Sequence, residues 1–359
     1  MSVSFFPEVF YPAGHDPYGI AAADFNADGN MDLAITVISS GDIAVLLGNG
    51  DGTFQGAVFY STGINPTGIV AADFNGDGKI DLATADSNGR DIAVLLGNGN
   101  GTFQVAMGFA AGSNPISIVA ADFNNDGKMD LSVTDLTTDN AVVLLGNGDG
   151  TFRAPIFYSV GNSPYGIASA DFNGDGNIDL AITNNGNSDI AVLLGNGDGT
   201  FKPAVSYSVG DGPSGIVVAD FNGDGKMDLA VSNYDSMNVA VLLGNGDGTF
   251  QNAVFFPIGS NLEGITAADF NGDGKIDLAV AGGNSNSIAI LLGNGNGTFQ
   301  AAQFFTVGNY ASQMAAVDFN NDGKIDLAVT DTFSSDVAVL INNTQMPKPV
   351  RGIPIWDIL

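Results

Sequence analysis

The chain has 359 residues, including 50 Gly, 13 Pro, no Cys and a single His, and its formal net charge at pH 7 is −29. A chain this acidic repels nucleic acid and anionic membrane surfaces, so neither is an expected partner. The lack of Cys and the lone His15 leave little room for thiol chemistry, His-based triads or His-ligated zinc. No apolar run is long enough to span a membrane, and no signal peptide precedes the first expected strand.

One ten-residue stretch, Asp-Phe-Asn-x-Asp-Gly-x-x-Asp-Leu, recurs along the chain at a constant spacing of 49 residues. Its first Asp falls at Asp24, Asp73, Asp122, Asp171, Asp220, Asp269 and Asp318. Seven copies at one fixed period are typical of a repeat architecture. We therefore predict one closed repeat domain over residues 1–346, in place of the two or three ordinary domains that this length allows.

Within one unit the expected elements follow each other in a fixed order. The fourth copy predicts strands at 166–172, 179–183, 190–194 and 204–210, separated by hairpin-length turns rich in Gly, Asn and Asp. The third strand, Ile190–Leu194, is apolar on both faces, which indicates sheets covered on both sides. A radial array of four-stranded blades provides such burial, so the sequence predicts an all-β, seven-bladed β-propeller with four antiparallel strands per blade.

The two ends of the chain predict how the ring closes. Residues 5–11 align with 54–60, so the chain starts on a fourth, outermost strand. It leaves the repeat after the third strand of the seventh unit, at 337–341. We expect the N-terminal strand to complete the last blade and so remove an exposed sheet edge. Residues 347–359 follow no repeat and are interpreted as a C-terminal tail.

The repeated stretch also has the chemistry of a calcium loop. Ca²⁺ takes six to eight oxygen ligands, and carboxylates at alternating positions around a turning Gly supply most of them. We number the loop from its first Asp and expect side-chain ligands at positions 1, 3, 5 and 9 and a backbone carbonyl at position 7. The predicted metal ligands are Asp24, Asn26, Asp28, Asn30, Asp32, Asp73, Asn75, Asp77, Lys79, Asp81, Asp122, Asn124, Asp126, Lys128, Asp130, Asp171, Asn173, Asp175, Asn177, Asp179, Asp220, Asn222, Asp224, Lys226, Asp228, Asp269, Asn271, Asp273, Lys275, Asp277, Asp318, Asn320, Asp322, Lys324 and Asp326.

We expect up to seven Ca²⁺, one per blade, with a structural role. Seven divalent cations would offset about half of the net negative charge, most of which these loops carry. An EF-hand is excluded, because its Glu at position 12 would fall at Ile35 and a strand follows where a helix should begin. Mg²⁺ is disfavoured by its tight octahedral geometry. An Asp/Asn/Gly turn without metal is the alternative. Weak Ca²⁺ sites suit an extracellular or cell-surface location.

The unit Asp-Phe-Asn-Gly-Asp-Gly-Lys-Ile-Asp-Leu-Ala, followed by Gly-Asn-Gly-Asp-Gly-Thr-Phe, resembles the VCBS/FG-GAP repeats. These repeats build the integrin α-subunit propeller and many secreted proteins. The resemblance covers residues 1 to about 346. It implies a seven-bladed propeller with Ca²⁺ in the hairpin between the first two strands of a blade. Position 3 is Asn here, where integrin loops usually carry Asp, which lowers the charge of each site.

Residues that recognise a ligand are expected where the units differ. Two segments vary, the one that enters each first strand and the turn between the second and third strands, and both should emerge on the face opposite the metal loops. Tyr rings beside carboxylates and amides suit a sugar, although Asn and Asp are common in turns anyway. The candidate ligand-binding residues are Tyr18, Asp86, Arg90, Asp135, Tyr165, Asn184, Asn233, Tyr234, Glu263, Asp331 and Phe333.

These observations favour an extracellular, Ca²⁺-binding adhesion or binding module for a glycan or a protein. Family resemblance cannot choose among the functions of such propellers. A polysaccharide-active lyase or hydrolase, or its accessory domain, is the main alternative, since a carboxylate pair on the variable face could run such chemistry. No catalytic residue is singled out, and His15 is expected to be exposed. A repeat scaffold without a natural ligand is the third possibility.

Overall fold

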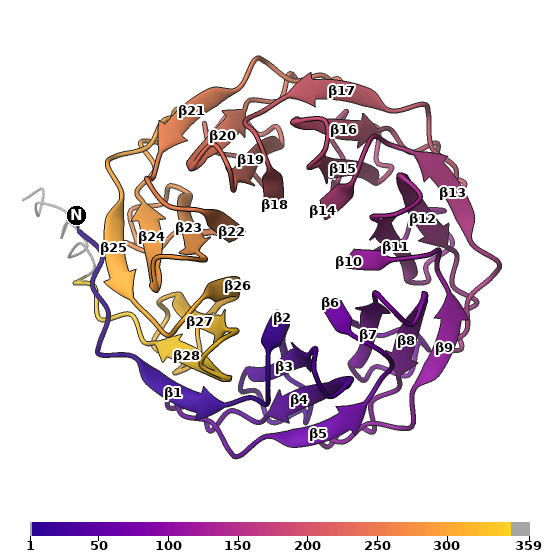
Figure 1. The fold of residues 1–359 in the computed structure, drawn as a ribbon, viewed down its shortest axis with the longest axis horizontal. Helices are drawn as coiled ribbons and strands as arrows, with labels where there is room; N and C mark the ends of the chain where they lie inside the picture. Colours follow the sequence, from indigo (N-terminus) through magenta and orange to yellow (C-terminus); the bar gives the residue numbers. More distant parts are fainter. Residues whose placement is uncertain (1, 346–359) are drawn as a thin grey trace, which may run out of the picture.

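The computed structural model describes residues 2–345, which form a ring of seven four-stranded antiparallel sheets (Figure 1). The predicted seven-bladed β-propeller is confirmed, and we number its blades 1 to 7 in chain order. The tail predicted at 347–359 lies outside the described residues. Within residues 2–345 we find no helix with the length and apolar character needed to cross a membrane.

Each blade runs from the centre of the ring to its rim through four strands of fixed type. The innermost strands of blades 1 to 7 are β2 (Pro17–Ala23), β6 (Pro66–Ala72), β10 (Pro115–Ala121), β14 (Pro164–Ala170), β18 (Pro213–Ala219), β22 (Leu262–Ala268) and β26 (Ala311–Val317). The second strands are β3 (Asp32–Val37), β7 (Asp81–Asp86), β11 (Asp130–Asp135), β15 (Asp179–Asn184), β19 (Asp228–Asn233), β23 (Asp277–Gly282) and β27 (Asp326–Asp331).

The two outer strands follow in the same order. The third strands are β4 (Asp42–Leu46), β8 (Asp91–Leu95), β12 (Asn140–Leu144), β16 (Asp189–Leu193), β20 (Asn238–Leu242), β24 (Ser287–Leu291) and β28 (Asp336–Leu340). The outermost strands are β5 (Val58–Ser61), β9 (Met107–Ala110), β13 (Ile156–Ser159), β17 (Val205–Ser208), β21 (Val254–Pro257), β25 (Gln303–Thr306) and, completing blade 7, β1 (Val9–Pro12).

The core lies between the blades. The second and third strands are buried almost throughout because each sheet packs against a neighbour on both faces. Seven apolar clusters result, each shared by two adjacent blades. The cluster between blades 3 and 4, for example, joins Phe123 and Val143 to Ile182, Leu193 and Phe201. The core of the ring is thus divided into seven equivalent apolar interfaces between adjacent blades, which we call seams.

The innermost strands approach each other closely around the axis. A Cβ added at Gly19 would lie 2.2 Å from the carbonyl oxygen of Thr67 in the next blade, so only Gly fits there. Hydroxyl groups of the second strands then link neighbouring blades. Thr36 Oγ1 donates to the Thr67 carbonyl at 2.9 Å, and Thr330 Oγ1 donates to the Tyr18 carbonyl at 2.7 Å. The second of these bonds joins blade 7 to blade 1 and closes the inner ring.

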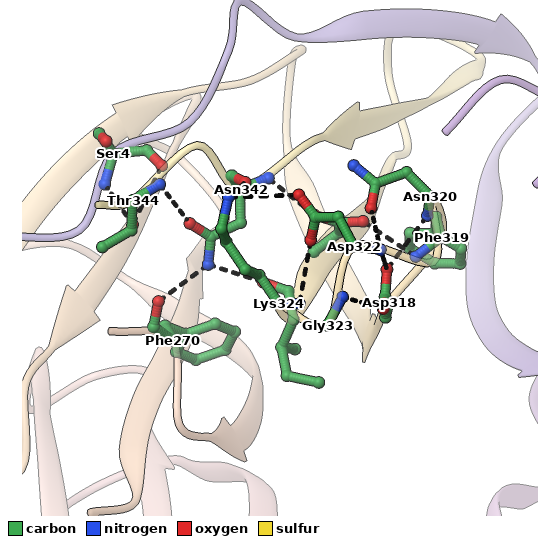
Figure 2. A network of polar contacts seen from close by, with 12 residues as sticks. Ser4, Phe270, Asp318, Phe319, Asn320, Asp322, Gly323, Lys324, Asn342 and Thr344 are labelled. Carbon is green, nitrogen blue, oxygen red and sulfur yellow. Dashed lines mark hydrogen bonds and ion pairs between the residues drawn. The ribbon is translucent and has the colours of Figure 1, made fainter. Parts of the chain in front are cut away.

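The predicted closure by the N-terminal strand is confirmed at the rim. Strand β1 pairs antiparallel with β28, with Val9 opposite Val339, and the indigo start of the chain lies beside its yellow end (Figure 1). The closing blade uses a special residue at the end of β28. Asn342 Nδ2 donates to the carbonyls of Phe270 at 2.8 Å and Ile325 at 2.9 Å, while its Oδ1 accepts from Thr344 N (Figure 2).

The Asn342 side chain replaces a backbone donor that the other blades provide. In blade 4, Gly199 N donates to the Phe123 carbonyl of blade 3 at 3.1 Å. Blade 7 lacks the corresponding Gly-rich loop, and the Asn342 amide makes the equivalent bond to Phe270 of blade 6. The seventh unit therefore departs from the repeat at Asn342, whose side chain makes the bond that the Gly-rich loop makes in the other blades.

Candidate functional site

The seven acidic loops are the hairpins between the first and second strands of each blade. We call residues 24–32 and their six equivalents the acidic loops. Their second residue is a buried Phe that anchors the hairpin between blades. Phe25, 2 % exposed, contacts Phe103 of blade 2 edge to face, with ring centroids 5.5 Å apart. Gly29, at φ 86°, makes the sharp turn at position 6.

Position 9 of each acidic loop is a fully buried Asp that ties two loops together. Asp179 Oδ2 accepts from Phe172 N at 2.9 Å, and its Oδ1 accepts from Gly195 N at 2.7 Å, which belongs to the loop between the third and fourth strands. The same pair of bonds recurs in all seven blades. Position 9 therefore has a structural role whether or not a metal binds.

The carboxylates of each acidic loop repel one another. Burial, and to a smaller extent the nearby negative charges of Asp175 and Asp171, raise the pKa of Asp179 to about 6, against the N–H groups whose hydrogen bonds it accepts. Every position-9 Asp shows the same direction and the same causes: Asp32, Asp81, Asp130, Asp179, Asp228, Asp277 and Asp326. The carboxylates at positions 1 and 5 thus lie close enough to position 9 to raise its pKa.

Except for the buried Asn271 of blade 6, the side chains at positions 1, 3 and 5 are at least partly exposed, and they accept hydrogen bonds from N–H groups of their own loop. In blade 7, Asp318 accepts from Asp322 N at 3.2 Å and from Gly323 N at 2.7 Å, while Asn320 Oδ1 accepts from Asp322 N at 3.0 Å (Figure 2). The Lys324 side chain at position 7 turns back to Asp322 at 3.2 Å. These oxygens are thus already bonded to the backbone of their own hairpin.

The donor set fits a hard cation, but the carboxylates do not already form a cage. Among residues 2–345, no three His, Cys, Asp or Glu side chains are grouped in a way that could hold a metal ion by themselves. Asn at position 3 and the carbonyl at position 7 are oxygen donors of other kinds, and Ca²⁺ commonly uses both. The predicted ligand sets and the seven Ca²⁺ remain a prediction.

The opposite face carries the variable segments, and there the structure corrects five candidates. The side chains at the ends of the second strands have no exposed surface and so cannot face a ligand: Asp86, Asp135, Asn184, Asn233 and Asp331. They are held inside their own blade. Asp135, for example, accepts from the N–H groups of Ser113 and Asn114 at 2.8 and 2.9 Å. These residues vary with turn geometry, which sequence comparison among the units could not separate from recognition.

Two other candidates meet across the central channel. The hydroxyls of Tyr18 and Tyr165 lie 2.5 Å apart, although they come from blades 1 and 4. They line a cavity of about 160 Å³ together with Gln313, which stands where most units have Gly. Burial, and to a smaller extent the negative charge of Glu263, raises the pKa of Tyr165 to about 12. Both phenols are therefore neutral at ordinary pH and act as hydrogen-bonding groups.

Three further candidates, Tyr234, Glu263 and Phe333, lie on blades 5 to 7. Together with Asn261, Asn284 and Tyr310 they form what we call the Tyr–Glu cluster. Tyr310 Oη donates to Glu263 Oε1 at 2.9 Å, and its ring packs on Phe333 with centroids 4.7 Å apart. Asn284 Nδ2 donates to Tyr234 Oη at 3.2 Å and to Asn261 Oδ1 at 3.1 Å. The Phe333 side chain is 63 % exposed, so the cluster is open to solvent.

Glu263 gives the Tyr–Glu cluster its charge. The residue is 8 % exposed, and no Lys or Arg forms an ion pair with it in the described part of the chain. Burial raises the pKa of its carboxyl, against the hydrogen bond from Tyr310. The pKa of Tyr310 is raised by burial first and then by Glu263 and Tyr234. The cluster can thus accept a hydrogen bond at a desolvated carboxyl beside an exposed ring.

Sequence reasoning missed Tyr310, and the structure shows the signal that marks it. Tyr310 has φ 64°, in the left-handed region, where the equivalent residues of other blades are Asp16, Asn65, Ser163 and Gly212. Asp, Asn and Gly tolerate this conformation, whereas a bulky aromatic residue there is an outlier. The sequence could have revealed this residue, because Tyr310 is aromatic at a position where the other units have residues that favour turns. Backbone strain of this kind is often kept at functional sites.

The remaining candidates stand apart from the cluster. Arg90 is exposed in the β7–β8 turn of blade 2, on the same face, and its backbone N–H donates to the Asp86 carbonyl at 3.0 Å. His15 is exposed as predicted, with 79 % of its side chain accessible, and its nearest charged partner is Asp16 at 3.3 Å. The structure thus brings together Tyr18 with Tyr165, and Tyr234 with Glu263 and Phe333.

Comparison with known proteins identifies the repeat. A family model described as an FG-GAP-like repeat matches six overlapping segments, 34–84, 73–133, 131–182, 171–231, 220–280 and 269–329. These segments together extend over most of the chain. No curated protein matches the sequence.

Solved structures share the fold at low sequence identity. The chain is similar to BBS1N, solved in complex with ARL6DN, with 13 % identity, a TM-score of 0.65 and coverage of 93 % of this chain and 97 % of that one. An Agrocybe aegerita lectin that recognises non-reducing terminal N-acetylglucosamine has 21 % identity, a TM-score of 0.57 and 80 % coverage of both chains. The Pseudomonas aeruginosa periplasmic gluconolactonase PpgL has 15 % identity, a TM-score of 0.62, and coverage of 80 % and 85 %. These likenesses show the fold alone.

Proposed function

This chain belongs to the FG-GAP repeat family, and we propose that it is an extracellular, Ca²⁺-stabilised binding module that holds a glycan or protein ligand on the face opposite its acidic loops. FG-GAP repeats are typical of extracellular proteins, and an extracellular medium supplies enough Ca²⁺ for weak loops. Calcium is structural in this proposal. Recognition belongs to the variable face.

The case for calcium rests on the convergent carboxylates of the acidic loops. After burial, the negative charges at positions 1 and 5 raise the pKa of the position-9 carboxyl in every blade, as described for Asp179. A divalent cation between them would replace that repulsion by attraction. Binding needs the side chains at positions 1 and 5 to exchange N–H groups of the loop, such as Gly323 N, for a shared metal. The backbone of the hairpin is already curved for this exchange by the Gly at position 6.

The observation that carries ligand binding is the Tyr–Glu cluster. It joins an exposed aromatic ring, a desolvated carboxyl and two amides from three blades, and one of its rings is held in a backbone conformation unusual for Tyr. An aromatic ring stacks on the apolar face of a sugar, and planar amide and carboxyl groups bind its hydroxyls. Because Glu263 brings negative charge, a neutral or amino-bearing sugar suits the cluster better than an acidic one.

The lectin among the similar structures binds a sugar, and BBS1N was solved with a protein partner. Both kinds of ligand are therefore compatible with a propeller of this general shape. A polysaccharide-cleaving enzyme is the weaker proposal. The burial that raises the pKa of Tyr18, Tyr165 and Tyr310 makes these phenols poor bases at neutral pH.

A glycan array probed with the full chain in excess Ca²⁺ and in EDTA tests the proposal, with a polysaccharide-cleavage assay on the same samples. Binding without cleavage supports it, and cleavage would favour the enzyme. For a bound glycan, Tyr310→Ala and Phe333→Ala are expected to weaken affinity at least about tenfold, as truncated aromatic anchors do. Arg90→Ala, on the same face but outside the cluster, is the matched control and should leave affinity unchanged.

A further inference from the structure

The last residue of each second strand faces the first residue of the third strand across a tight turn. In blades 4 and 5 an amide occupies the first of these positions. Asn184 Nδ2 donates to Asp189 Oδ1 at 2.8 Å, and Asn233 Nδ2 donates to Asn238 Oδ1 at 2.8 Å. A donor and an acceptor therefore hold the two strands together at this buried point.

Blades 2 and 7 have two carboxyl groups at the same place. Asp86 lies opposite Asp91 and Asp331 lies opposite Asp336, in the same register as the amide pairs. Asp86 Oδ1 accepts from Thr84 Oγ1 at 2.9 Å, and Asp331 Oδ2 accepts from Gly308 N at 3.0 Å. Four further oxygens of these two pairs are buried without a hydrogen-bond partner: Asp86 Oδ2, Asp91 Oδ1, Asp331 Oδ1 and Asp336 Oδ1.

No cation in the surroundings compensates these acids. Around Asp86, the packed strands β6 and β9 and the loop 62–65 contain no titratable side chain, and the adjacent Arg90 is exposed and forms no ion pair within residues 2–345. Strand β26 likewise contains no titratable side chain beside Asp331.

The other charged or titratable neighbours of the blade 7 pair add negative charge or none. Glu8 acts on Asp331 as a further negative charge. Tyr310 from the preceding loop and Tyr11 of β1 are neutral phenols, and His15 faces Asp16 at the surface. Two ionised, unpartnered carboxylates in such a site would be strongly unfavourable.

We infer that each of these two acid pairs holds one shared proton in the folded protein, so that blades 2 and 7 contain buried proton-binding sites that make their strand pairing pH-dependent. The proton takes the place of the amide hydrogen that Asn184 and Asn233 provide in their blades. One carboxyl is protonated and donates its O–H to an oxygen of the other. The burial of Asp86 and Asp331, which raises the pKa of each to about 7, agrees with this geometry.

The sign of the pH dependence follows from this raised proton affinity. An unfolded Asp loses its proton near pH 4, whereas the folded pair keeps one to about pH 7. Between these values the folded state binds more protons than the unfolded state, so the stability contributed by the pair falls as pH rises from about 4 to about 7 and then levels off.

Paired substitutions between blades give the test, with the full chain in excess Ca²⁺ so that the acidic loops do not titrate. Asp86→Asn should recreate the blade 4 arrangement. Its unfolding equilibrium constant should match that of the unchanged protein at pH 5 and be at least about tenfold smaller at pH 8. Asn184→Asp is the reverse exchange and should introduce a new pH-dependent loss of stability with Asp189. Asp331→Asn should behave like Asp86→Asn.

A stability difference between Asp86→Asn and the unchanged protein that is the same at pH 5 and pH 8 would overturn the inference. A second measurement does not depend on unfolding. Carbon NMR of Asp carboxyl groups should show signals that titrate near neutral pH and disappear in the Asp86→Asn and Asp331→Asn variants. If all carboxyl signals in Ca²⁺ titrate below pH 5, the pairs hold no shared proton.

Discussion

The two faces of this propeller are built from the same seven units and yet differ in kind. On one face, every acidic loop repeats the same Phe anchor and the same two hydrogen bonds to the position-9 Asp. On the other face, the residues that follow the second strands differ from blade to blade, and only blades 5 to 7 gather an open aromatic and acidic cluster. Identical residues in every unit suit packing, because all seams are equivalent. Residues that differ among the units are required wherever a ligand contacts only one part of the ring.

Calcium removal is expected to have the largest effect, and it acts on the uniform face alone. A cation that binds only the folded state adds about 2.7 kcal/mol per site when its concentration is 100 times Kd, and up to seven sites contribute. The melting temperature should therefore fall markedly from excess Ca²⁺ to EDTA. Differential scanning calorimetry measures this. An unchanged melting temperature would contradict this prediction and would indicate that the acidic loops are turns that bind no metal.

The pH dependence of stability tests the face of the acidic loops in a second way. In EDTA all the position-9 carboxyls have a raised pKa, about 6 for Asp32 and Asp179, whereas unfolded Asp loses its proton near pH 4. Stability in EDTA should therefore fall as pH rises from about 4 to about 6. Excess Ca²⁺ should abolish or reverse this decline, because the metal competes with protons. Denaturant titrations at pH 4 to 8, with and without Ca²⁺, distinguish the two slopes.

The Phe anchor provides a comparison between seam and rim. Phe123 is 1 % exposed and packs on Phe201, so Phe123→Ala should cost about 3–5 kcal/mol of unfolding free energy. Phe157 lies on the outermost strand at 49 % exposure, and Phe157→Ala should cost far less. Urea unfolding of both variants gives the difference. Equal losses would contradict the placement of the core between blades.

The smallest expected effect lies at the channel. Tyr18→Phe removes the hydroxyl contact with Tyr165 and should cost about 0.5–1.5 kcal/mol, the usual range for one hydrogen bond. Thermal melting of the variant measures this cost. A loss several times larger would mean that the two tyrosines hold blades 1 and 4 together, so that the variable face also fastens the ring.

The sequence predicted the ring, its closure and the position of the acidic loops because each follows from a pattern repeated without error. The same pattern gave the wrong surroundings for Asp86, Asp135, Asn184, Asn233 and Asp331. All five follow an apolar strand and precede a turn, so their types fit both a solvent-facing loop and a buried strand end. Only the register of the hairpin, in which Asp86 faces Asp91, decides between the two.

The Tyr–Glu cluster could be predicted only in part for a different reason. Tyr234, Glu263 and Phe333 stood out as departures from their own columns, but their proximity depends on three blades curving around one axis. Tyr310 lies two positions before Ser312, the residue of its unit that is equivalent to Tyr18 and Glu263. Its aromatic ring at a turn position was visible, whereas its hydrogen bond to Glu263 requires the fold.

The closure of blade 7 has a mechanical consequence. At the rim, the two ends of the described chain are joined by the pairing of β1 with β28, four residues long, and by the contacts around Asn342. Pulling on the ends of the described chain would therefore load this pairing first, and β1 would separate from β28 before the apolar interface between blades 7 and 1 opened. The acid pair Asp331–Asp336 lies beside this pairing, where Asp336 faces Pro12 of β1. The force at which β1 separates should consequently depend on pH, and a strand released from one copy could complete blade 7 of another.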